Sequence, residues 1–217
     1  MKKFAAAVIA GSLFSTAAFA AQYEVSITNL TRAQSITPIL VASHKAGFKL
    51  FELGTPASDE LAALAEGGAT GPLETSLYDS GKVIDINKSD GLLGPGETTT
   101  VEINVPRHWR AEISVAAMFI PTNDGFMALN AAKVPLFNKS TTYLSPVYDA
   151  GSEPNDEKCE NIPGPVCGGS GGSLPHEDDE GYVHIHSGIH GIGEDLDAAT
   201  YDWRNPAAKI TIKRVRH

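Results

Sequence analysis

Three segments of the chain alternate strictly between apolar and polar residues, and this pattern limits the fold more than any other feature. Over residues 23–28 the odd positions hold Tyr, Val and Ile, and the even positions hold Glu, Ser and Thr. The same period of two recurs over residues 99–105 and 208–213. Because successive side chains of a strand point to opposite faces of a sheet, each segment predicts a strand with one buried face. A sandwich of two antiparallel sheets would bury those faces.

Two further segments complete the predicted fold. Residues 111–120 are the most apolar stretch and predict a central strand buried on both faces. One short helix is predicted, with Thr55 as its N-cap, Pro56 in its first turn and its end at Gly67 and Gly68. This Ala-rich helix is expected to connect strands rather than to form a layer of the core. The predicted fold class is therefore all-β, with one short helix and one long loop.

The first twenty residues are typical of a secretory signal peptide. Lys2 and Lys3 precede an apolar run over residues 4–14, and residues 18–20 read Ala-Phe-Ala, an A-x-A cleavage site. The run is too short to cross a bilayer, so no membrane span is expected. We expect a signal peptide over residues 1–20, a single domain over residues 21–217, and a periplasmic or secreted location.

The charge of the chain argues against nucleic acid as a partner. The formal net charge is −9, and it becomes about −11 once the two lysines of the leader are removed. A surface of this sign repels phosphate backbones, whereas it attracts cations and basic partners.

The two cysteines, Cys159 and Cys167, lie in a polar segment rich in proline and glycine. An oxidising compartment is expected to join them in a structural disulfide, since the C-x-x-C spacing of a redox pair is absent. The same long loop, residues 151–180, holds Gly-Gly-Ser-Gly-Gly at positions 168–172. This matches the G-x-S-x-G motif of hydrolases, but neither the required strand nor the required helix is predicted around it, so we expect a loop.

Carboxylates at two loop tips form a first candidate metal site. Asp124 lies in an Asn-Asp-Gly turn, and Asp149 and Glu153 lie in the segment 148–153. Hard cations such as Ca²⁺ take carboxylate and carbonyl oxygens of this kind as ligands. On composition alone, solvated acidic turns are the more frequent explanation.

Three histidines within seven residues, His184, His186 and His190, form a second candidate site. On a strand, positions 184 and 186 point to one face, so their imidazoles could bind one Zn²⁺ or Cu²⁺. His190 is a candidate third ligand, and His44 is a candidate from elsewhere in the chain. The alternative is that these histidines bond to the backbone or cover a sheet face. A histidine-bound metal could also hydrolyse a substrate, but nothing selects one, so no enzymatic activity is expected.

Five segments, taken in order, resemble the spondin domain, which is named after F-spondin and mindin, in its bacterial stand-alone form. They extend over nearly all of the mature chain, at residues 23–31, 38–44, 122–126, 148–153 and 202–208. The resemblance implies an eight-stranded antiparallel β-sandwich of C2-like type, in agreement with the predicted strands.

The resemblance also implies a bound calcium ion with Asp124, Asp149 and Glu153 as carboxylate ligands. Glu153 departs from the family pattern, which has aspartate at that position. The animal relatives are matrix and cell-adhesion proteins, so the resemblance implies an exported binding, adhesion or scaffold domain with an unknown protein or glycan partner. The alternative function is a periplasmic copper- or zinc-binding protein that uses the histidine cluster.

Overall fold

A computed structural model describes residues 20–106, 110–136, 139–172 and 177–215, and the statements below concern these residues. The predicted signal peptide, apart from Ala20, lies outside them. Within the described residues, no helix is long and apolar enough to cross a membrane.

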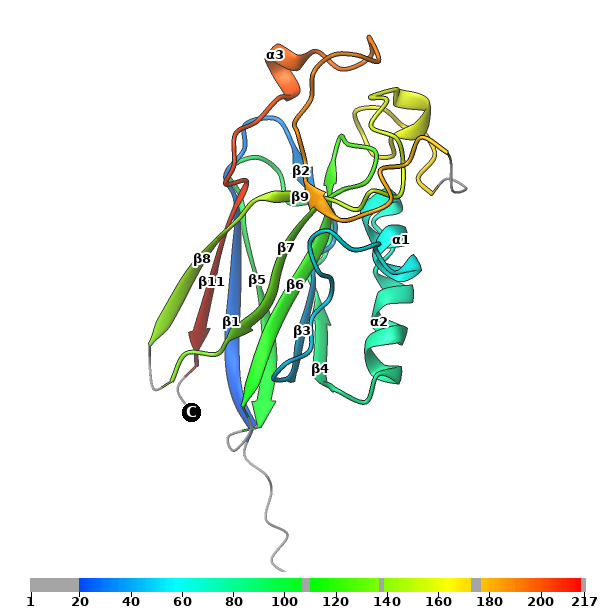
Figure 1. Cartoon of the computed structure of the whole chain (residues 1–217). Helices are drawn as coiled ribbons and strands as arrows, with labels where there is room; N and C mark the ends of the chain where they lie inside the picture. The colour runs from blue at the N-terminus through cyan, green and yellow to red at the C-terminus, as the bar shows by residue number, and fades with distance from the viewer. Residues whose placement is uncertain (1–19, 107–109, 137–138, 173–176, 216–217) are drawn as a thin grey trace, which may run out of the picture.

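Two antiparallel sheets pack face to face (Figure 1). The smaller sheet has the strand order β5-β1-β11-β8, and the larger has the order β10-β9-β7-β6-β3-β4, with β2 paired to β6. The strands are β1 (Ala20–Asn29), β2 (Ser35–Ile36), β3 (Leu40–Lys45), β4 (Val83–Lys88), β5 (Thr98–Pro106), β6 (Ala111–Ile120), β7 (Gly125–Lys133), β8 (Ser140–Ser145), β9 (Val147–Asp149), β10 (His184–Ile185) and β11 (Ala208–Arg214). The all-β sandwich is confirmed, but the described residues form eleven strands rather than the eight that the resemblance implies. Eight of the eleven have six or more residues.

The predicted alternation of β1 is confirmed by the burial of its side chains. Val25 and Ile27 are fully buried, whereas the alternating polar residues Glu24, Ser26 and Thr28 are partly exposed. The register places Val25 beside Val101 of β5 and Ile212 of β11, so apolar side chains of neighbouring strands form continuous rows. These rows are one wall of the main core between the two sheets.

β6 is buried on both faces, as its apolar sequence predicts. Ile113, Val115 and Phe119 belong to the core between the sheets. Ala116 belongs to a second apolar cluster on the opposite face of the larger sheet. The turn that follows Ile120 and leads to β7 therefore begins at a strand that is packed on both faces.

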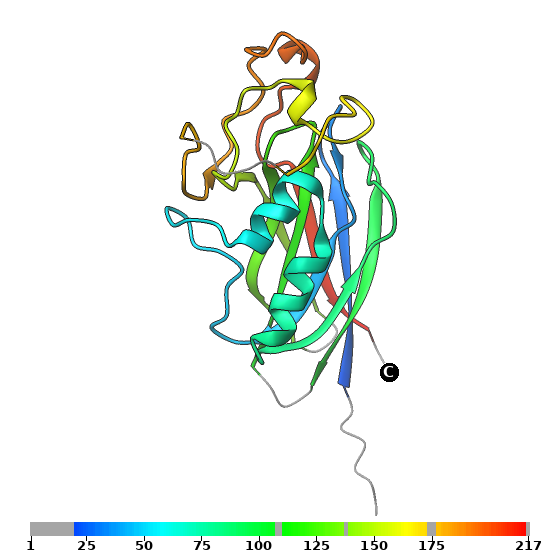
Figure 2. The same ribbon diagram turned by 90° about the vertical axis from the view of Figure 1, so that its right-hand side faces the viewer.

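Two helices cover the outer face of the larger sheet, which corrects the prediction of one connecting helix (Figures 1 and 2). They are α1 (Asp59–Gly67) and α2 (Thr70–Asp79). Leu61 and Leu64 are fully buried in the second apolar cluster, so the helices form a third layer. The end of α1 at Gly68, with φ of 67°, agrees with the prediction, but the N-cap is Ser58 rather than Thr55.

The loops that contain the candidate metal ligands gather at one end of the sandwich, which we call the loop end (Figure 1). It comprises the turn between β6 and β7, the segment from β9 through the 3-10 helix η1 (Cys159–Asn161) to β10, and the segment from β10 to α3 (Ala198–Tyr201). β1 begins and β11 ends at the opposite end (Figure 1).

Candidate functional site

Strand pairing brings Asp124 and Asp149 together. Asp124 immediately precedes β7, and Asp149 is the last residue of β9, which pairs with β7 so that Gly125 lies opposite Asp149. The backbone N–H of Ala150 donates to the carbonyl of Asp124 at 3.2 Å, which joins the two loops. Both carboxylates are fully buried.

The two oxygens of Asp124 differ in their surroundings. Its Oδ2 accepts from the backbone N–H groups of Ser152 and Glu153, at 2.8 and 3.2 Å. Its Oδ1 is buried and has no hydrogen-bond partner among the described residues. A carboxylate oxygen buried without a donor is costly unless a proton or a cation accompanies it.

Burial raises the pKa of Asp124 well above its usual range, and the nearby charge of Asp149 adds to the shift. The N–H groups of Ser152 and Glu153 act in the opposite direction. Burial likewise raises the pKa of Asp149, against the effect of its hydrogen bond from Asn155. Both shifts arise chiefly from burial, which disfavours the charged form of a carboxyl group.

Glu153, the third predicted carboxylate ligand, follows β9 on the same loop as Asp149, and it is buried. Its backbone N–H donates to Asp124 Oδ2 at 3.2 Å. In the described part of the chain, the acidic and histidine residues whose ligand atoms all lie within 4.8 Å of one another are Asp149, Glu180 and His184.

Glu180 is a site residue that the sequence did not reveal, because it belongs to an acidic run in a long loop. Asn155 holds it in place: its Nδ2 donates to Asp149 Oδ2 at 2.7 Å and to Glu180 Oε1 at 3.0 Å. The neighbouring Gly181 N–H donates to the carbonyl of Gly151 at 2.8 Å, so the long loop folds back onto β9. Only the contact between these distant segments identifies the residue.

Both histidines of β10 and its flank lie against Asp149. The register pairs His184 with Asp149, and His184 Nε2 lies 3.4 Å from Asp149 Oδ1. His186 Nε2 lies 4.0 Å from Asp149 Oδ2. Burial lowers the pKa of His186 to about 4, and the charges of His184 and His190 act in the same direction. The ring of His186 is therefore neutral at neutral pH.

The other two candidate histidines occupy different places. His190 is exposed, and its backbone N–H donates to Glu157 Oε1 at 2.6 Å. His44 does not join the cluster, which corrects the expectation that it could. It pairs with Glu112 near the start of β6, whereas Asp124 lies level with the end of that strand, roughly 26 Å away at the usual rise per residue. Its Nε2 is bonded to Ser114 Oγ at 2.8 Å.

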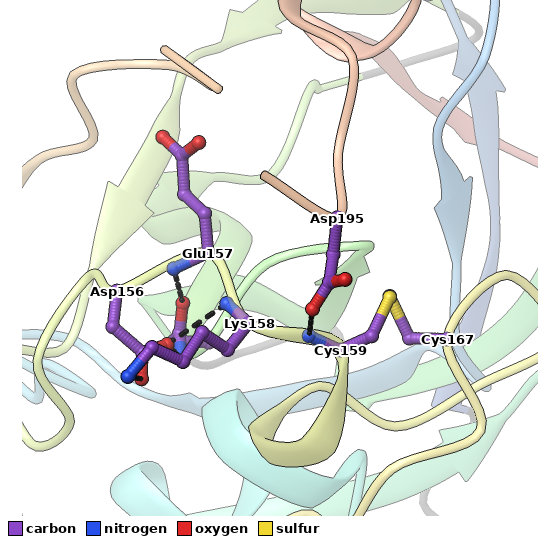
Figure 3. Close-up of a disulfide and its surroundings, with 7 residues drawn as sticks. Asp156, Glu157, Lys158, Cys159, Cys167 and Asp195 are labelled. Carbon is purple, nitrogen blue, oxygen red and sulfur yellow. Dashed lines mark hydrogen bonds and ion pairs between the residues drawn. A yellow bond between two sulfur atoms is a disulfide. The ribbon is translucent and has the colours of Figure 1, made fainter. Parts of the chain in front are cut away.

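The predicted disulfide between Cys159 and Cys167 is present (Figure 3). Asp195 Oδ2 accepts from the backbone N–H of Cys159 at 2.9 Å (Figure 3). The carboxylate of Glu157 accepts from three successive backbone N–H groups, those of His190, Gly191 and Ile192. The disulfide loop is thereby attached to the segment that follows the histidines.

A cavity of about 620 Å³ lies between α1 and the loop that follows Asp149. Three carboxylates, Asp59, Glu66 and Asp179, line it together with the backbone of Gly151 and small side chains. The loop that carries two of the candidate calcium ligands thus also forms one wall of an acidic cavity.

The model of the protein family described as Spondin_N matches residues 7–154 of this chain. The match begins within the predicted leader, includes Asp124, Asp149 and Glu153, and ends before Glu180 and the histidines of β10. No curated protein matches the chain.

Proposed function

This chain belongs to the spondin N-terminal domain family, and from that membership we propose that it is an exported binding or scaffold domain whose loop end is ordered by one calcium ion. The proposed ligands are Asp124, Asp149 and Glu153, with backbone carbonyls and water in the remaining positions. Calcium takes six to eight oxygen ligands in flexible geometry, which suits residues from two adjoining loops.

The observation that carries this proposal is the burial of Asp124 beside Asp149. Neither forms an ion pair with lysine or arginine within the described part of the chain, and Asp124 Oδ1 has no hydrogen-bond donor there. Two buried like charges at adjacent loops are stable together when a cation neutralises them. These residues therefore fit a calcium ion, which would supply that charge and tie the two loops together.

The role of the ion in this proposal is to fix a binding surface. The segment between Asp149 and Glu153 lines the acidic cavity beside α1. We expect a partner that presents a positively charged group to this cavity, in keeping with the negative charge of the chain. Protein and glycan partners that carry amines both meet this condition.

Export supports the same role. The leader over residues 1–20 would deliver the chain to the periplasm or to the exterior, where a disulfide persists and where calcium is available at concentrations that suit extracellular sites. A carrier of four histidine ligands is not proposed, because His44 lies at the other end of β6. That the chain has no enzymatic activity stays a prediction.

The test is calcium binding by the mature chain and by Asp124→Asn. We expect calorimetry to detect one calcium per chain in the wild type and none in the variant at the same concentrations. Asp90→Asn is the matched control, since Asp90 is an exposed acid in the loop after β4. If Asp124→Asn and Asp149→Asn each leave the calcium affinity and the thermal midpoint unchanged, the proposal is wrong.

A further inference from the structure

Asp149 lies between the predicted calcium ligand Asp124 and a second group of side chains that includes Glu180 and His184. This second group lies beyond the segment matched by the family model, which ends at residue 154. We propose that this side of the loop end binds a second cation, a divalent transition metal of the Zn²⁺ type, through Asp149, Glu180 and His184. The inference shares Asp149 with the proposed calcium site, so the experiment below separates the two.

The hydrogen bond of His184 determines which nitrogen can bind a metal. Its Nδ1 lies 3.1 Å from the carbonyl oxygen of Ile185. A carbonyl oxygen only accepts, so in the neutral ring Nδ1 carries the proton and Nε2 presents a lone pair. That lone pair faces Asp149 Oδ1 at 3.4 Å. A backbone carbonyl on one nitrogen and a free lone pair on the other is the usual arrangement of a metal-binding histidine.

The second carboxylate presents an oxygen to the same place. Glu180 contributes a ligand atom within 4.8 Å of those of Asp149 and His184. Glu180 Oε1 accepts a hydrogen bond from Asn155, whereas Glu180 Oε2 is buried and has no hydrogen-bond partner among the described residues. Three electron-pair donors thus converge, and Asp149 Oδ1 also accepts from the backbone N–H of Gly151 at 2.8 Å. A cation among them relieves their mutual repulsion.

His186 gives separate evidence for a ligand site, because its buried imidazole lies beside Asp149 with one ring nitrogen unpartnered in the described chain. Its side chain is only 1% exposed, and its Nε2 lies 4.0 Å from Asp149 Oδ2 with no hydrogen-bond partner in the described chain. Its Nδ1 accepts from the backbone N–H of Gly188 at 3.0 Å, so in the neutral ring Nε2 carries the proton. His186 Nε2 therefore has no lone pair to offer a metal, and His184 is the imidazole ligand of the proposed site.

The separation of the ligand atoms suits zinc. Zinc bonds of 2.0–2.2 Å to nitrogen and oxygen at a tetrahedral angle place two ligand atoms about 3.4 Å apart. His184 Nε2 and Asp149 Oδ1 are 3.4 Å apart. Two carboxylates and a neutral imidazole also balance a divalent charge. Calcium takes oxygen ligands, so the imidazole selects for a transition metal. Three protein ligands leave a fourth position for water or for a group of a partner.

The experiment uses the mature chain, prepared without a histidine tag and freed of metal by a chelator. Zinc is titrated against a competing chelator, and Co²⁺ serves as a second probe because tetrahedral Co²⁺ with imidazole ligation absorbs visible light. We expect one zinc per chain, a loss of at least 100-fold in zinc affinity in His184→Ala, and loss of the cobalt absorption. His190→Ala is the matched control and should keep both signals.

Two comparisons keep this proposal separate from the calcium proposal. Asp124→Asn should lose calcium and keep zinc, and His184→Ala should lose zinc and keep calcium. If the folded wild type binds no zinc, or if His184→Ala and His184→Gln bind it as tightly as the wild type, the zinc site is wrong whatever calcium does. If zinc binds as described and calcium does not, only the proposed calcium site is wrong.

Discussion

At the scale of single residues, the loop end is governed by which polar atoms are already used. Asp124 has one oxygen engaged by backbone N–H groups and one without a donor. His184 and His186 are two positions apart, yet a carbonyl beside one ring and an N–H beside the other give their Nε2 atoms opposite roles. Residue type and spacing therefore predicted the candidates, whereas their hydrogen bonds decide what each can do.

His44 allows a test of pH dependence away from the metal ligands. Burial lowers its pKa below the ordinary 6.5, against the effects of the Lys45 carbonyl and Glu112. As the pH falls below 6.5, the unfolded chain takes up a proton that the folded chain does not, so stability is lost; above it, both forms are neutral. We expect His44→Gln to lose less stability than the wild type between about pH 7.5 and about pH 5.

Urea unfolding at the two pH values provides the measurement. Because the carboxylates are the same in both proteins, the difference in their pH dependence isolates His44. Equal losses in the two proteins would show that His44 is protonated as easily in the folded chain as in the unfolded one.

Gly151 provides a second test at this scale. Its φ is 66°, and a Cβ atom there would lie 2.4 Å from the carbonyl oxygen of Tyr182. We expect Gly151→Ala to lower the free energy of unfolding by about 1–3 kcal/mol, since both the backbone conformation and the close approach of the long loop are disturbed. Gly54→Ala is the comparison for the conformational part alone, because Gly54 has φ of 81° and open space around it. Equal losses in the two variants would contradict the close approach.

At the scale of elements, sequence patterns predicted the strands better than the helices. The strands of the main core follow a period of two, which depends only on the alternation of faces. α2 was missed because Gly71 and Pro72 suggest a loop, although they lie in its first turn, where proline is tolerated since the N–H groups have no partner within the helix. The buried Leu73 and Leu77 were the overlooked signal.

The N-cap of α1 is Ser58, whereas the sequence predicted Thr55, and mutation can distinguish the two. Ser58 Oγ accepts from the backbone N–H of Leu61 at 3.2 Å, whereas Thr55 Oγ1 bonds to the carbonyl of Glu52, outside the helix. We expect Ser58→Ala to lower the free energy of unfolding by about 1 kcal/mol, measured by urea unfolding, and Thr55→Ala to lower it less. The reverse order would restore Thr55 as the cap.

The disulfide loop is tested by Cys159→Ser combined with Cys167→Ser. The bond closes a short loop, so its loss should lower stability by roughly 2–3 kcal/mol in urea unfolding. Because the Glu157 carboxylate and Asp195 still attach the loop, we expect the double variant to fold. Failure of the double variant to fold would show that the hydrogen bonds alone do not hold the loop end.

At the scale of the whole molecule, the residues that form the main core and the residues proposed to bind metal lie in different parts of the sandwich. The main core lies between the sheets, and the ligands of the two proposed metal sites lie at the loop end, away from the start of β1 and the end of β11 (Figure 1). Metal binding is therefore expected to stabilise the loop end by linkage rather than to form the core.

Calcium removal should lower the thermal midpoint of the mature chain. At a calcium concentration of 100 times Kd, binding stabilises the folded state by about 2.7 kcal/mol. For a domain of this size, that corresponds to a fall of roughly 5–10 °C when calcium is chelated. Scanning calorimetry with and without EDTA measures it, and Asp124→Asn should show no such fall. An equal fall in wild type and variant would assign the effect of EDTA to another site.

The sequence by itself determined the core strands β1, β5, β6 and β11 with their buried faces, the end of α1, the disulfide and the types of ligand on offer. These follow from local periodicity and side-chain chemistry, which need no knowledge of distant contacts. Only the tertiary structure decided that Glu180 and His184 meet Asp149 and that His44 does not. The physical reason is that strand register and the folding back of a long loop select which distant residues become neighbours, and one sequence pattern is compatible with many such pairings.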